Sequence, residues 1–193
     1  FIEIGAGDYT ECNTRFLTMK DSWQGLILDG SKGILDVKKK YSNLIWKNKL
    51  KFGCEWITKE NINEIISKYK FNLNIGLLSI DIDGNDYWIW KAIDIINPII
   101  VIIEYNSLFG KKNKISVPYL EKFDRYSAHK SGLYWGSSIS ALTELGKSKG
   151  YILVGGNSAG VNLYFVRNDR NLTSKIFVTD MRLLLFLTTF FRI

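Results

Sequence analysis

Residues 81–86, with the sequence DIDGND, carry the highest density of acidic and amide side chains that could bind a ligand or react. They directly follow a short apolar run. Three carboxylates within six residues repel one another unless a cation, a donor or a ligand lies among them. Asp81 and Asp83 therefore suit two roles: lying beside a bound cofactor or the reacting group, or holding a divalent metal ion through hard oxygen ligands. A helix N-terminus, where acidic side chains are favoured, is the purely structural interpretation.

A glycine pair and a second acidic residue precede that segment. Gly5 and Gly7 follow the apolar run 1–4, which also contains Glu3, and Asp29 follows the run 25–28. Glycines at such a turn let the backbone approach a ligand closely, and a carboxylate about 20 residues further on can accept hydrogen bonds from ribose hydroxyls. The third glycine of the dinucleotide fingerprint is missing, and the sequence contains no P-loop.

Further polar residues follow the run 99–103. Glu104, Tyr105 and Asn106 open a long connection to residue 136, and the single histidine, His129, lies within it. Loops of this length usually carry function or move. As general bases we consider Asp81, Glu104 and His129, in that order. Asp83, Asn85, Tyr105 and Asn106 are the candidates for substrate binding, and the favoured interpretation includes no metal site.

Alternating apolar runs and helix-like segments must position these residues. We expect strands at 1–4, 25–28, within 51–57, at 76–80 and at 99–103, and helices at 11–20, 31–41, from Thr58 onward, 87–96 and 138–149. Two further strands, 151–154 and 161–166, are joined by a glycine-rich turn. This order predicts an α/β domain over residues 1–168, with a mostly parallel sheet, helices on both faces and a closing antiparallel hairpin. That is the Rossmann-like arrangement of class I methyltransferases.

Composition narrows the possible partners. The net charge is +7, but the basic residues are spread along the chain, so we do not expect nucleic-acid binding. Cys12 and Cys54 have no metal-ligand spacing and favour a reducing, cytoplasmic setting. We expect no transmembrane segment, because the apolar run 183–190 is too short. The start on an apolar run suggests a trimmed chain, and residues 169–193 are expected to form a tail of unspecified structure.

Taken together, the motifs EIGAG, SIDIDGND and the closing hairpin resemble those of FkbM-type methyltransferases, over about residues 1–167. The segment GLLSIDIDGNDYWIW is similar to an uncharacterised subgroup of that superfamily. Ser79, Asp83 and Asp86 depart from the Lys, Glu and Glu usual in the family's motif. The resemblance implies that Glu3, Gly5 and Gly7 line an S-adenosylmethionine site, that Asp29 holds its ribose and that Asp81 lies near its methionine end.

The function expected from these observations is S-adenosylmethionine-dependent methylation, most often of a hydroxyl on a sugar, glycan or small metabolite. Two alternatives stay open. A metal-dependent nucleotide-sugar transferase would use Asp81 and Asp83 as metal ligands, and a non-catalytic module would bind the cofactor without turnover. The acceptor and the oligomeric state are left open by the sequence.

Overall fold

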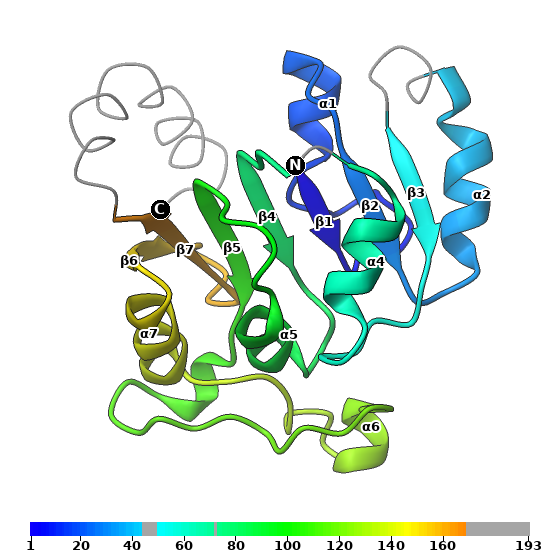
Figure 1. Cartoon of the computed structure of the whole chain (residues 1–193). Coiled ribbons are helices and arrows are strands. Elements are labelled where there is room, and N and C mark those ends of the chain that lie inside the picture. Colours follow the sequence, from blue (N-terminus) through cyan, green and yellow to red (C-terminus); the bar gives the residue numbers. More distant parts are fainter. Residues whose placement is uncertain (44–49, 72, 169–193) are drawn as a thin grey trace.

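The computed structural model describes residues 1–43, 50–71 and 73–168, in which seven strands form one sheet (Figure 1). The spatial order is β3-β2-β1-β4-β5-β7-β6. The strands are β1 (Ile2–Ile4), β2 (Leu26–Asp29), β3 (Lys51–Cys54), β4 (Leu77–Ile80), β5 (Ile100–Glu104), β6 (Tyr151–Gly156) and β7 (Asn162–Arg167). The described helices are α1 (Arg15–Asp21), α2 (Gly33–Lys40), α4 (Ile62–Lys68), α5 (Asp86–Ala92), α6 (Arg125–Ala128) and α7 (Ile139–Ser148), with a 3-10 turn η1 (Ser107–Phe109).

The sheet is parallel from β3 to β5 and antiparallel at its other end. Strand β7 lies between β5 and β6 and runs antiparallel to both. Apolar residues without polar alternation fill β5, as a strand covered on both faces requires. The inserted antiparallel strand confirms the predicted class I methyltransferase fold.

Helices cover both faces of the sheet. Side chains of α4, α5 and α7 pack against one face, where Trp90 is the largest fully buried residue. Side chains of α1 and α2, including Leu17 and Ile34, pack against the other face. Successive strand residues point to opposite faces, so Ile2 and Ile4 join the first core while Glu3 points toward the α1 side.

Three helices differ from the sequence-based ranges by four residues at one end. The first was expected from residue 11 but begins at Arg15, because residues 5–14 follow an irregular path in which Tyr9 has a φ of 60°. The fourth was expected to reach residue 96 but ends at Ala92. Its last carbonyl accepts a hydrogen bond from Nδ2 of Asn63, and Lys149 donates to the carbonyl of Ile93, so side chains replace the next helical turn.

The start of α4 also corrects an expectation. A helix was expected from Thr58 onward, but α4 begins at Ile62, and residues 58–61 form a hydrogen-bonded turn before it. Oδ1 of Asn61 accepts from the Thr58 N–H at 2.8 Å, and Oγ1 of Thr58 accepts from the Asn61 N–H at 3.2 Å, as in a capping box. The reciprocal pair is therefore formed with an amide one methylene shorter than glutamine.

The long connection after β5 is only partly regular. It contains η1 and α6, and an isolated bridge between Ser116 and Ser137 closes it against its own end. The predicted tail, 169–193, lies outside the described residues. Within the described ranges, no helix has the length and apolarity that crossing a membrane requires.

Candidate functional site

A cavity of about 780 Å³ opens at the carboxyl ends of β1 to β4. Its walls are the segments that follow these four strands, and residues 121 and 123 of the long connection complete it. Open α/β sheets bind ligands at this edge, where neighbouring loops diverge. The cavity therefore lies where the fold predicts a ligand site.

Asp29 joins two of these walls. Its Oδ2 accepts a hydrogen bond from the Gly7 N–H at 2.7 Å, and its Oδ1 accepts from the Ser31 N–H at 2.7 Å. Each carboxylate oxygen has a second lone pair, so both can still accept from a ligand. The turn after β1 and the turn after β2 are thus fixed around one carboxylate at the cavity wall.

The glycine turn has open space on its cavity side. Gly7 has a φ of +52°, and a Cβ added there would meet no atom within 4 Å. Steric crowding therefore does not explain this glycine, but its left-handed backbone does, because L-residues adopt that conformation at a cost. The turn presents bare backbone to the cavity.

Glu3 lies beneath the turn and is almost fully buried, at 1% exposure. Burial raises the pKa of Glu3 to about 7, although hydrogen bonds with Thr14 and Ser79 oppose the shift. Oε2 of Glu3 has no hydrogen-bond partner within the described part of the chain. A buried carboxyl with one unsatisfied oxygen at a cavity wall can accept a hydrogen bond from a bound ligand.

The segment after β4 brings several charges together. Oδ1 of Asp83 pairs with Nη1 of Arg125 at 2.6 Å. Asp86 is buried and uses both carboxylate oxygens to accept from the backbone N–H groups of Ile82 and Gly84. Burial, with a smaller contribution from Asp83, raises the pKa of Asp81 to about 6. Asp83 and Asp86 are thus held by protein donors, whereas Asp81 faces the cavity without such a partner among the described hydrogen bonds.

Glu104 lies behind this segment, at the end of β5. It is buried, and its Oε2 has no hydrogen-bond partner among the described residues. Burial, then the charges of Asp86, Asp81 and Asp83, raise the pKa of Glu104 to about 11. Glu104 is therefore a neutral acid near pH 7, and it is not one of the residues that line the cavity.

Residues 117–125, which we call the strap, contribute Glu121 and Phe123 to the cavity wall. Nε1 of Trp56 donates to the Glu121 carbonyl at 3.0 Å, and Nδ2 of Asn85 donates to the Leu120 carbonyl at 2.7 Å. The ring of Phe123 occupies the space that a Cβ on Gly84 would need. Indole and amide donors from two neighbouring loops thus hold the strap at the cavity wall.

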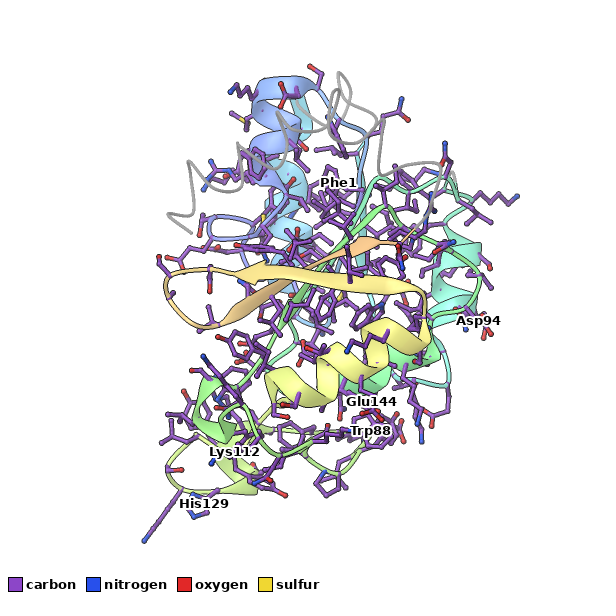
Figure 2. All side chains as sticks on the ribbon, turned by 90° about the vertical axis from the view of Figure 1, so that its left-hand side faces the viewer. Phe1, Trp88, Asp94, Lys112, His129 and Glu144 are labelled. Carbon is purple, nitrogen blue, oxygen red and sulfur yellow. The ribbon has the colours of Figure 1, made fainter. Side chains whose placement is uncertain are left out.

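The structure brings together seven of the predicted site residues at the cavity wall: Glu3, Gly5, Gly7, Asp29, Asp81, Asp83 and Asn85. Glu104, Tyr105 and Asn106 lie outside its lining. The amide of Asn106 is used within the long connection, since its Nδ2 donates to the carbonyls of Leu133 and Trp135. His129 is exposed, and Figure 2 shows it at the end of the molecule opposite Phe1.

The residues that the sequence analysis missed come from the strap and from the end of β3. Trp56 lines the cavity and packs against Gly30, while Phe123 and Glu121 reach it from the strap. Trp56 lies near the end of the range 51–57, in which a strand was expected, and a position at a strand's carboxyl end is a signal that could have identified it. The strap, which includes Arg125, belongs to the long connection whose length indicated a functional or moving loop, but irregular loops have no periodicity that identifies single residues.

Metal binding was the alternative role of Asp81 and Asp83. Among the residues that the structure describes, no group of three or more His, Cys, Asp or Glu side chains is arranged to hold a metal ion. The ion pair to Arg125 already satisfies one oxygen of Asp83. The metal role therefore stays a hypothesis without a supporting contact.

No family model matches the sequence, and a comparison with curated proteins found no match. Among solved structures, the chain is similar to the pyocyanin biosynthetic protein PhzM, at 14% identity over 86% of this chain, with a TM-score of 0.47. It is also similar to TnmH, at 12% identity over 87% of this chain, with a TM-score of 0.48. The chain spans about half, 49%, of the length of each. Likeness at this level gives no residue correspondence.

Proposed function

We propose that this domain binds S-adenosylmethionine and transfers its methyl group to a small-molecule acceptor. The observation that carries the proposal is the placement of Asp29, a carboxylate at the end of β2 that lines the cavity and accepts a hydrogen bond from the glycine turn after β1. In a doubly wound sheet, this is the position that binds the hydroxyls of a nucleoside ribose. The inserted strand β7 supports the methyltransferase version of such a sheet.

The other walls fit the remaining parts of that cofactor. The indole of Trp56 and the side chain of Ile57 line the end of the cavity beside Asp29 and offer apolar surface to an adenine ring. Gly5, Gly7 and the unsatisfied oxygen of Glu3 would receive the amino acid part. When bound, S-adenosylmethionine supplies an electrophilic methyl group. The protein's own task is then to place the acceptor and to take its proton.

For the proton, the geometry favours Asp81 over the other two candidates. Asp81 lines the cavity, and its raised pKa, about 6, leaves it mostly ionised but basic near neutral pH. Glu104 is a neutral acid outside the lining, so its role would be to donate a hydrogen bond or to hold a proton. The exposed His129 does not line the cavity. The finer expectation of methylation at a hydroxyl of a sugar or metabolite is part of this proposal.

Calorimetric titration of S-adenosylmethionine and of S-adenosylhomocysteine tests the proposal. We expect micromolar binding by the intact protein and a loss of at least about ten-fold for Asp29→Asn, because the ribose loses a charged acceptor. Asp36→Asn is the matched control, since Asp36 lies exposed on α2 and pairs only with Lys39 among the described ion pairs. Far-UV circular dichroism verifies that both variants fold.

Three results would redirect the proposal. Absence of binding by the folded wild-type protein contradicts the cofactor site, and binding of a nucleotide sugar with Mn²⁺ instead would revive the metal role of Asp81 and Asp83. Cofactor binding without product formation across a broad panel of acceptors would favour the non-catalytic module.

A further inference from the structure

The cavity and the rest of the chain carry opposite charge. The chain has 26 basic and 19 acidic residues, yet eight of the residues lining the cavity are Asp or Glu, and none is Lys, Arg or His. Clefts lined by one sign of charge concentrate ligands of the opposite sign and repel those of the same sign. A cavity wall of this composition therefore favours the binding of cationic ligands over anionic ones.

Protein cations offset only part of this charge. Asp83 pairs with Arg125, and Glu55 pairs with Lys68 at 2.7 Å. Among the described ion pairs, none involves Asp81 or Glu121. Glu3 adds only part of a charge near neutral pH, because burial raises its pKa to about 7. The negative potential thus extends from the floor of the cavity to the strap.

An independent observation at the strap end points to a hydrogen-bond donor as ligand. Asn85 lines the cavity with 5% exposure, and its Nδ2 is used to hold the strap at Leu120. Its Oδ1 has no hydrogen-bond partner in the described part of the chain. A buried amide oxygen left without a donor is costly, so a ligand N–H or O–H at this point would relieve it.

We propose that the methyl acceptor binds as a cation, a small molecule carrying a protonated amine that contacts the carboxylate of Asp81 and Oδ1 of Asn85. This inference rests on the proposed function and narrows its acceptor class, since the methylated atom can still be a hydroxyl of an amine-bearing molecule. An ammonium group offers three donors and a positive charge, which match two acceptors at a negative wall. An acceptor with a carboxylate or phosphate would be repelled by the same wall.

Three probes that share a phenylethyl group and differ in the charge of their terminal group distinguish the effect of charge on binding from that of size. They are 2-phenylethylamine, 2-phenylethanol and 3-phenylpropionate. Each is titrated into the protein saturated with S-adenosylhomocysteine, which lacks the sulfonium charge, and binding is followed by ligand-observed NMR. We expect the amine to bind about ten-fold more tightly than the alcohol and the carboxylate to bind least. Raising the salt from about 50 to about 500 mM should weaken binding of the amine but not of the alcohol.

Variants locate the contact. Asp81→Asn and Asn85→Leu should each reduce the preference for the amine to about two-fold or less, whereas Glu144→Gln, on the remote pair with Lys114, should leave it unchanged. Equal binding of the three probes, or a preference for the carboxylate, in a protein that does bind S-adenosylhomocysteine overturns the cationic acceptor and leaves the proposed function intact. Failure of S-adenosylhomocysteine itself to bind overturns the proposed function, and the inference falls with it.

Discussion

The backbone carbonyl oxygen of Asp81 lies 1.6 Å from the point where a Cβ on Gly5 would stand. The turn after β1 therefore passes so close to the end of β4 that only glycine fits, and the N–H of Asp81 donates to the Ile4 carbonyl at 2.9 Å beside it. This contact fixes the two strand ends that frame the cavity floor.

Gly5→Ala and Gly7→Ala should consequently differ in stability. Both residues have positive φ, which costs an alanine about 1 kcal/mol, but only Gly5 meets another backbone atom. We expect Gly5→Ala to lower the free energy of unfolding by more than about 2 kcal/mol and Gly7→Ala by about 1 kcal/mol. Urea unfolding followed by circular dichroism measures both, and similar losses in the two variants would contradict the close approach.

Asp86 should be a stability residue of the site rather than a reacting group. Asp86→Ala leaves the buried N–H groups of Ile82 and Gly84 without their acceptor, so we expect a loss of about 1–3 kcal/mol in the free energy of unfolding. Asp86→Asn keeps one acceptor and removes a charge from the cluster, and its loss should be smaller. Asp36→Ala serves as the exposed control. A larger loss in the free energy of unfolding for Asp86→Asn than for Asp86→Ala would argue against this role.

Stability should depend on pH through Glu104. Its pKa in the folded protein lies near 11, above the ordinary value of 4.5, so folding takes up a proton at neutral pH. The stability associated with this group is complete below about pH 4.5 and falls by about 1.4 kcal/mol per pH unit as the pH rises toward the folded pKa. Glu104→Gln removes this dependence.

The measurement is chemical unfolding of the wild type and Glu104→Gln between about pH 5 and pH 8. The variant should gain stability relative to the wild type as the pH rises, since glutamine pays no protonation cost. Parallel curves for the two proteins would show that Glu104 ionises normally in the fold.

The strap depends on the pair of Gly84 and Phe123. A Cβ on Gly84 would lie 2.2 Å from a ring carbon of Phe123, and the φ of Gly84 is not in the left-handed region. Gly84→Ala should therefore displace the ring without straining its own backbone. Hydrogen exchange should rise in residues 117–125 and remain unchanged in β5.

A double-mutant cycle with Gly84→Ala, Phe123→Ala and the double variant tests this contact. With the ring removed, Gly84→Ala should cost almost nothing further, giving a coupling of about 1 kcal/mol between the two positions. Additive effects would mean that the strap is held mainly by Trp56 and Asn85.

Sequence reasoning reached the frame of the site because strands and their ends follow simple rules. The β-branched run before Glu104 could only be a buried strand, and the carboxyl ends of parallel strands meet at one edge, which brought Gly7, Asp29 and Asp81 together. The start of α1 was missed because residues 11–14 continue the irregular path that begins at the glycine turn and includes the left-handed Tyr9, so the helix begins only at Arg15.

The position of the strap could not be predicted from the rules for strands and their ends. Its position depends on side chains such as Trp56 donating to carbonyls 65 residues away, and a sequence contains no local trace of that pairing. The same holds for Arg125, whose partner Asp83 lies 42 residues earlier. Proximity created only by tertiary packing has no periodic signature.

The late position of β7 in the chain has a consequence for synthesis on the ribosome. Strand β5 is complete at Glu104, but its outer edge is covered only by residues 162–166, which are translated almost sixty residues later. During that interval the nascent chain presents an open edge of consecutive isoleucine and valine residues, the kind of edge on which chains aggregate. Chaperone demand should therefore peak while residues 105–161 are being made, and a chain stalled there should be less soluble than one that has passed Arg167.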